Sequence, residues 1–173
     1  MRVIPARIRT VVTGEIYERI FDLISGGHYR LLWDVDQAQK IASRSHVLPK
    51  TIPATDLLDG VVTKDLDMSH TNNVDPSQGT VIVAEFPLLP EGFVVIDGNH
   101  RVYRAYHMGA SVSAVTLNES QMLDALLHDR FRLYYAIHWN ISRWVTIEVT
   151  GNIPSPYPWM KLSPDDLSQP PLT

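Results

Sequence analysis

The alternation of apolar and polar residues along the chain predicts an α/β protein of the α+β type, with a small mixed sheet and packed helices. Thr80–Phe86 and Phe93–Ile96 are the clearest strands, and the short segment between them contains proline and glycine, which favours a hairpin. Ala110–Leu117 also alternates and predicts a further strand. Between the last two strands, apolar residues at helical spacing predict a helix that follows His100 and ends near Gly109.

The N-terminal quarter of the chain predicts short elements of both kinds. Residues 2–12 alternate loosely and indicate a short strand. Ile16, Ile20, Leu23 and Ile24 share one face of a helix, which Gly26 and Gly27 would end. After it we expect a strand over 28–33 and a helix from Asp34 to about Arg44.

The remaining segments connect or follow this core. The sequence predicts an extended stretch over 47–58, mostly loop over 58–79, a helix from Asn118 or Ser120 to about His138, and a last strand over 144–149. From Pro154 the chain is rich in proline and predicts an extended or disordered tail. We therefore expect three parts: an N-terminal extension packed on the core (1–46), the core domain (47–150) and a proline-rich tail (151–173).

Composition narrows the classes of function. The formal net charge of −4 counts against a nucleic-acid coat, which needs a basic face to bind phosphates. The chain has no cysteine, which excludes disulfides and thiolate chemistry and suits a cytoplasmic location. We expect neither a signal peptide nor a membrane span. The seven histidines lack metal-ligand spacing, so no zinc site is predicted.

Polar residues are concentrated where the strand ending at Ile96 meets the following helix, in Asp97-Gly98-Asn99-His100-Arg101. The N-terminus of a helix carries free N–H groups and partial positive charge, so this junction predicts an anion site, most plausibly for phosphate. Gly98 would let the backbone approach the anion, or would simply serve the turn.

Each neighbour of the glycine has a functional and a structural interpretation. His100 would bind phosphate or act as a general acid or base, or would only cap and pack. Arg101 would bind phosphate, or form a salt bridge with Asp97. Asn99 tolerates left-handed backbone geometry. Arg104, one turn further, is a weaker candidate for phosphate binding, because an arginine at such a position is more often a solvated helix residue.

Carboxylates supply the remaining candidate chemistry. Asp97 would orient His100 or Arg101, accept a proton from a substrate hydroxyl, or cap the turn. Asp56 is the favoured catalytic partner elsewhere in the chain, and Asp65, Asp67 and Glu85 are further candidates as oxygen ligands for Mg²⁺. The aromatic residues Tyr134, Tyr135, Trp139 and Trp144 are expected in the core.

These motifs resemble the ParB/sulfiredoxin superfamily. The junction at 97–101, followed by Ala105 and Gly109, is similar to the family's strand, Gly-His-Arg turn and helix with a small residue. Ile52–Leu58 is similar to the family's entry strand, and Val81–Ala84 to its central strand. By the motif of the turn, the chain looks closest to ADP-dependent free serine kinases.

The resemblance spans roughly residues 47–117 and implies a site for ATP, ADP or CTP with Mg²⁺. It further implies phosphoryl transfer to a small hydroxyl compound, or nucleotide hydrolysis. Without cysteine, sulfiredoxin chemistry is excluded, and no basic helix-turn-helix segment follows the motif, which counts against a partition role. A non-catalytic nucleotide sensor or protein-interaction module is the alternative, and a homodimer is among the expected assemblies. DNA binding or nuclease action is expected least.

Overall fold

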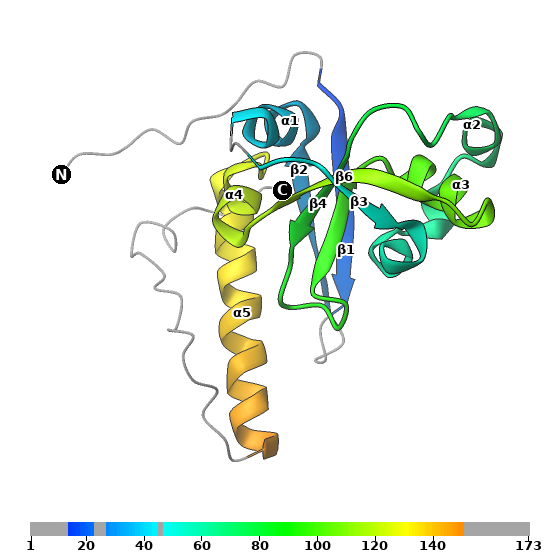
Figure 1. Ribbon diagram of the computed structural model, residues 1–173. Helices are drawn as coiled ribbons and strands as arrows, with labels where there is room; N and C mark the ends of the chain where they lie inside the picture. Colours follow the sequence, from blue (N-terminus) through cyan, green and yellow to red (C-terminus); the bar gives the residue numbers. More distant parts are fainter. Residues whose placement is uncertain (1–13, 23–26, 45–46, 151–173) are drawn as a thin grey trace.

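A mixed four-stranded sheet organises the fold in the computed structural model, which describes residues 14–22, 27–44 and 47–150 (Figure 1). The strands lie in the order β3 (Lys50–Pro53), β6 (Ser111–Leu117), β4 (Val81–Glu85) and β5 (Phe93–Asp97). β6 is parallel to β4, whereas β3 pairs with β6, and β5 with β4, in antiparallel fashion. The predicted α+β class, the three strands and the β4–β5 hairpin are confirmed.

A separate antiparallel hairpin is formed by β1 (Ile16–Asp22) and β2 (His28–Asp34), in a register that pairs Ile16 with Asp34. The helix predicted from Ile16 onward is therefore wrong, and the strand predicted over 28–33 is confirmed. The spacing of Ile16 and Ile20 is even, so it fits one face of a strand as well as one face of a helix. That face is the exposed one, because Ile16 and Ile20 are 43% and 55% exposed while Phe21 is 4% exposed.

One face of the four-stranded sheet is covered by the hairpin and three helices, α1 (Val35–Arg44), α4 (Glu119–Asp124) and α5 (Asp129–Thr150) (Figure 1). The helix predicted to end near Arg44 is confirmed as α1. Trp33 and Leu31 of β2 and Tyr135 of α5 are fully buried in this layer. Large side chains from segments far apart in sequence thus fill one core, since burying apolar surface is the main favourable contribution to folding.

The opposite face packs against α3 (Asn99–His107) and the single 3₁₀ turns η1 (Ala54–Asp56) and η2 (Leu58–Gly60), and a third turn, η3 (Thr63–Asp65), follows them in the chain. Val102 and Ala105 of α3 have no exposed surface and belong to one core cluster with Val83 of β4 and Val95 of β5. The predicted helix after the 97–101 junction, ending before Gly109, is confirmed.

The segment predicted as mostly loop contains η2, η3 and a short helix, α2 (Met68–Asn73). Asp67 begins this helix, because its carboxylate accepts hydrogen bonds from the backbone N–H groups of Ser69 and His70. Both bonds lower the pKa of the Asp67 carboxyl, and the bond from the His70 N–H has the larger effect. Local capping thus orders a segment whose polar composition predicts a loop.

The C-terminal helix predicted to end near His138 is two helices. A capping box of Asn118 and Gln121 begins α4, and α5 then runs to Thr150, so the strand predicted over 144–149 is wrong. A strand needs a neighbour for its backbone groups whereas a helix satisfies its own, and none of the described strands pairs with this segment.

Two further predictions, the strand at 2–12 and the extended tail from Pro154, lie outside the described residues. Of the aromatic residues expected in the core, Tyr135 and Trp139 are buried, whereas Tyr134 and Trp144 are 36% and 57% exposed. Within the described ranges, none of the helices has the length and apolar character needed to cross a membrane.

Candidate functional site

The junction between β5 and α3 has a backbone that requires glycine. Gly98 precedes the first residue of α3 and has a φ of +91°, a left-handed backbone conformation that residues with a side chain rarely adopt. A Cβ atom built there would lie 2.9 Å from Val81 Cγ2 and 3.0 Å from Arg101 Nη2. The left-handed position therefore belongs to Gly98, and Asn99, for which this geometry was expected, is already helical.

The N-terminus of α3 is not capped by a side chain. The hydrogen-bond ladder of the helix starts with the N–H of Val102, which donates to the Gly98 carbonyl at 2.9 Å. The N–H groups of residues 99–101 precede this ladder, so they are free of intrahelical acceptors and carry the positive end of the helix dipole.

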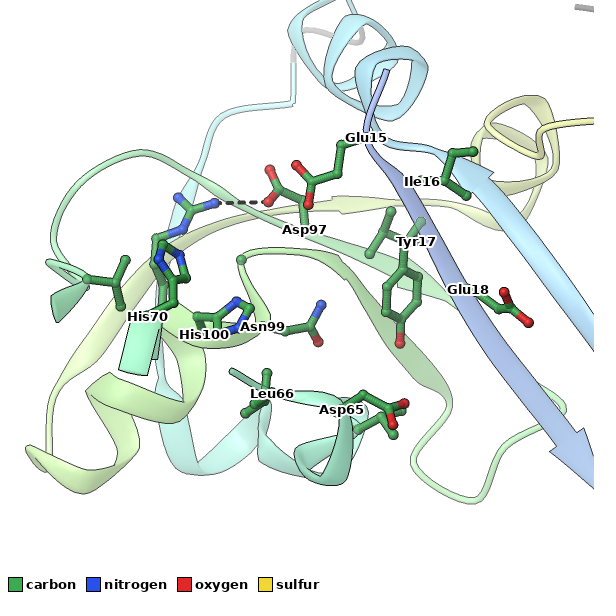
Figure 2. A pocket seen from close by; sticks show the side chains of 15 residues that line it. Glu15, Ile16, Tyr17, Glu18, Asp65, Leu66, His70, Asp97, Asn99 and His100 are labelled. Carbon is green, nitrogen blue, oxygen red and sulfur yellow. Dashed lines mark hydrogen bonds and ion pairs between the residues drawn. The ribbon is translucent and has the colours of Figure 1, made fainter. Parts of the chain in front are cut away.

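These N–H groups belong to residues that line a cavity of about 310 Å³ (Figure 2). The junction forms one wall, the start of β1 a second, and the segment from η3 to α2 a third. The cavity thus lies where three segments far apart in sequence meet, at the end of edge strand β5. Besides residues 96–101, the lining consists of Glu15, Ile16, Tyr17, Glu18, Val62, Asp65, Leu66, His70 and Val74.

The lining is acidic. It contains the carboxylates of Glu15, Glu18, Asp65 and Asp97, against the single guanidinium of Arg101. Glu15 and Glu18 come from the wall at the start of β1, Asp97 from the junction and Asp65 from η3, so the carboxylates reach the cavity from three walls (Figure 2). A bare phosphate would meet repulsion from these charges, so an anion at the helix N-terminus requires a cation that accompanies it.

Arg101 is held at the edge of the cavity by two partners. Its Nη2 lies 3.3 Å from Asp97 Oδ1, and its Nη1 donates to the carbonyl of Gln78 at 3.0 Å. The other Asp97 oxygen accepts a hydrogen bond from Gln39 Nε2 of α1 at 3.1 Å. The salt bridge between Asp97 and Arg101, the structural alternative for this arginine, is therefore formed, with both side chains about 15% exposed.

His100 connects α3 to the wall formed by α2. Its Nε2 accepts a hydrogen bond from the backbone N–H of Asp67 at 3.2 Å, which places the ring proton on Nδ1. The ring meets that of His70 edge to face, with centroids 4.7 Å apart. Burial, and then the charge of His70, lower the pKa of His100, against the opposing charges of Asp67 and Glu15. A neutral imidazole with Nδ1–H as its available donor follows.

Two buried polar atoms in the cavity lining lack partners among the described residues: the hydroxyl of Tyr17 and Oδ1 of Asn99. Burial raises the pKa of the Tyr17 hydroxyl, which keeps it protonated. Asn99 uses its amide nitrogen to donate to the carbonyl of Val95 at 3.2 Å. Unsatisfied buried polar atoms cost free energy, and a hydroxyl- or amide-bearing ligand would satisfy them.

Sequence-predicted residues divide into those that line the cavity and those that do not. Gly98, Asn99, His100, Arg101 and Asp97 all line it, and so does Asp65. Asp56 does not: it lies in η1, on the same face of the sheet as α3 but outside the lining, and accepts a hydrogen bond from the Thr55 hydroxyl at 3.1 Å. Arg104, Asp67 and Glu85 are likewise outside the lining.

Sequence reasoning missed Glu15, Tyr17 and Glu18, because the start of β1 was interpreted as helical. The available signal was the alternation of Tyr17, Arg19 and Phe21, which are more buried than their neighbours in the strand. Alternation predicts a strand but does not say which cavity its end reaches.

Among the described residues, no three histidine, aspartate or glutamate side chains gather as a metal site. No protein-family model matches the chain, and neither a curated protein nor a solved structure matches it.

Proposed function

We propose that the chain binds a nucleotide, with its phosphates at the N-terminus of α3, and transfers the terminal phosphoryl group to a small hydroxyl compound. The observation that carries this proposal is the uncapped N-terminus of α3, with left-handed Gly98 before it, opening onto a cavity lined by Arg101. Free N–H groups, a helix dipole and a guanidinium together form an anion site.

The acidic lining makes the proposal specific, because it calls for a nucleotide that enters as its Mg²⁺ complex. Mg²⁺ is usually held by one or two carboxylates together with phosphate oxygens, and Glu15 and Asp97 are the cavity carboxylates that would hold it. When bound, the ion supplies charge neutralisation at the transferred phosphoryl group. The pair of carboxylates fits this group without a complete protein cage.

The residues of the chain then have distinct tasks. The N–H groups of residues 99–101 and the Arg101 guanidinium bind phosphoryl oxygens, and His100 donates from Nδ1. Of Glu15 and Asp97, the carboxylate that does not coordinate the ion accepts the proton of the substrate hydroxyl as the phosphoryl group is transferred. Asp56 has no task, because it lies outside the cavity.

One observation favours the alternative of a nucleotide sensor without catalysis. Asp97, the carboxylate next to the phosphate turn, already has two partners, Arg101 and Gln39. Each of its two oxygens already accepts a hydrogen bond, so neither is free to receive the hydroxyl of a substrate. DNA binding stays the weakest candidate, since phosphates of a duplex would face the same acidic lining.

Calorimetric titration with ATP, ADP and CTP tests binding. We expect binding only with Mg²⁺ present, and a loss of about 10- to 100-fold in affinity for Arg101→Ala, the range for a hydrogen bond to a charged group. Arg104→Ala is the matched control: it lies on the same helix outside the cavity and should bind like the wild type. No binding of any of the three by the wild type contradicts the proposal.

Catalysis is tested by ³¹P NMR with Mg–ATP or Mg–ADP and a panel of small hydroxyl compounds. We expect a new phosphoester signal that is lost in Glu15→Gln and Asp97→Asn but kept in Asp56→Asn, the control outside the cavity. Binding of a nucleotide without any phosphoester or free phosphate would favour the sensor instead.

A further inference from the structure

A second cavity of about 610 Å³ adjoins the first and shares two residues with it, Asp97 and Arg101. It lies between α1, the segment before β3 and the start of β4, so its other walls belong to elements that the first cavity does not use. The salt bridge between Asp97 and Arg101 therefore stands at the boundary of two cavities. A ligand that contacts this pair has space on either side of it.

The two cavities differ in chemistry. The second is walled mainly by apolar side chains, those of Ala42, Val47, Leu48, Pro49, Ile82 and Val115. Its polar groups besides the shared pair are neutral: the amide of Gln39 and the hydroxyls of Ser43 and Thr80. Apolar walls with a few polar groups and a volume of several hundred cubic ångströms are typical of sites for small organic molecules.

We propose that this second cavity binds the nucleoside part of the nucleotide, an inference that rests on the proposed function. A nucleotide has an apolar-faced base at one end, a hydroxyl-bearing sugar next and charged phosphates at the other end. The protein presents matching surfaces in the same order: the apolar cavity, its neutral polar groups, Arg101 at the boundary, and the N-terminus of α3. The first cavity is then left for the terminal phosphoryl group and the acceptor.

Gly79 keeps the boundary open. It has φ of +76°, and a Cβ atom there would lie 2.6 Å from Arg101 Nη1. Gly79 also lines the second cavity, so the guanidinium lies directly against a backbone without a side chain. Arg101 thereby stays accessible to a ligand that reaches it from the nucleoside side.

The test compares Mg–ATP with Mg–tripolyphosphate, which carries the phosphates without the nucleoside. We expect the wild type to bind Mg–ATP at least 10-fold more tightly. Ser43→Trp, which places an indole in the second cavity, should lower the affinity for Mg–ATP at least 10-fold and leave that for Mg–tripolyphosphate within about 2-fold. Lys40→Trp is the matched control, since Lys40 is an exposed residue of the same helix outside both cavities.

A second variant controls for the possibility that Ser43→Trp loses binding through misfolding. Leu48 is 81% exposed, so Leu48→Glu changes the charge of the apolar wall without removing a core side chain, and we expect the same selective loss of Mg–ATP. Equal affinity of the wild type for both ligands, or equal losses for both ligands in the two cavity variants, overturns the inference while the phosphate site stands. Failure of the wild type to bind either ligand overturns the proposed function and the inference with it.

Discussion

The two principal walls of the acidic cavity are built in opposite ways. The wall at residues 97–101 consists of consecutive residues, and its shape follows from one left-handed glycine between a buried strand and a helix. The wall at residues 15–18 belongs to a hairpin that is placed by side chains elsewhere, including Trp33 on its second strand. Local conformation thus forms the wall with the proposed phosphate site, and tertiary packing positions the carboxylates of the wall at residues 15–18.

The largest expected effect is on the second of these walls. Trp33 is fully buried and contacts Phe86 with ring centroids 6.3 Å apart, so Trp33→Ala should lower the free energy of unfolding by about 3–5 kcal/mol. Ile20→Ala, on the exposed face of the same hairpin, should cost less than about 0.5 kcal/mol. Urea denaturation measures both, and similar costs for the two would show that the hairpin is not placed by this packing.

The wall at residues 97–101 should be sensitive to a change in its backbone conformation at Gly98. Gly98→Ala forces a Cβ into left-handed geometry and against Val81, so we expect a loss of about 1–3 kcal/mol in unfolding free energy, together with weaker nucleotide binding. Gly92→Ala is the control: it has φ of +77° but open space around a Cβ. It should cost less and leave binding intact. Equal effects on stability and binding would mean that the close approach at Gly98 is unimportant.

Within the hairpin, a largely buried ion pair should matter more than an exposed one. Arg19 donates to the Gly60 carbonyl at 3.2 Å and to Glu91 at 3.0 Å, with its side chain 12% exposed. Arg19→Met should cost about 1–2 kcal/mol, because two acceptors lose their donor. Arg30→Met removes the exposed pair with Glu18 and should cost less than about 0.5 kcal/mol. Denaturation curves that rank the two the other way would contradict this assignment.

The smallest effect concerns pH, through the imidazole that joins the junction to α2. Burial lowers the pKa of His100 below its ordinary 6.5, so the unfolded chain takes up this proton first as the pH falls. The neutral His100 therefore contributes to the free energy of unfolding, and this contribution is complete above about pH 6.5. It is lost as the pH falls from that value through the lowered pKa of His100 in the folded state. Protonation also removes the acceptor of the Asp67 N–H.

Thermal denaturation between pH 5 and pH 7.5 measures this contribution. His100→Gln should flatten part of the decline in stability that the wild type shows toward low pH. The remaining decline includes His138, whose pKa burial also lowers. His107→Gln, at an exposed position of α3, should leave the wild-type profile in place. A profile for His100→Gln that coincides with the wild type would remove this histidine from the pH dependence.

The same contrast explains what the sequence predicts well. Strands β4, β5 and β6, helix α3 and the residues of the junction follow from local patterns, because alternation, a glycine and the start of a helical pattern lie within a short stretch. The hairpin strand β1 was predicted as a helix because Ile16 and Ile20 satisfy both periods, and only packing against the core decides between them.

The site was predictable to the same extent. Residues 97–101 line the cavity as expected. Asp56, favoured because it lies where the entry strand of the resembling family delivers residues to the site, is outside the lining. A position at the end of a predicted strand does not report which cavity the side chain reaches. The extent of α5 was also missed, since Val, Thr and Ile near its end favour a strand in isolation.

The double anchoring of Arg101 has a consequence for the thermodynamics of binding. A free arginine side chain has about 2 kcal/mol of rotamer entropy to lose when a ligand fixes it. Here the bonds to Gln78 and Asp97 fix the guanidinium before any ligand binds, so the rotamer entropy of Arg101 is lost on folding and not on binding. Association then needs no search among rotamers, and differences in affinity among ligands should be expressed mainly in their dissociation rates.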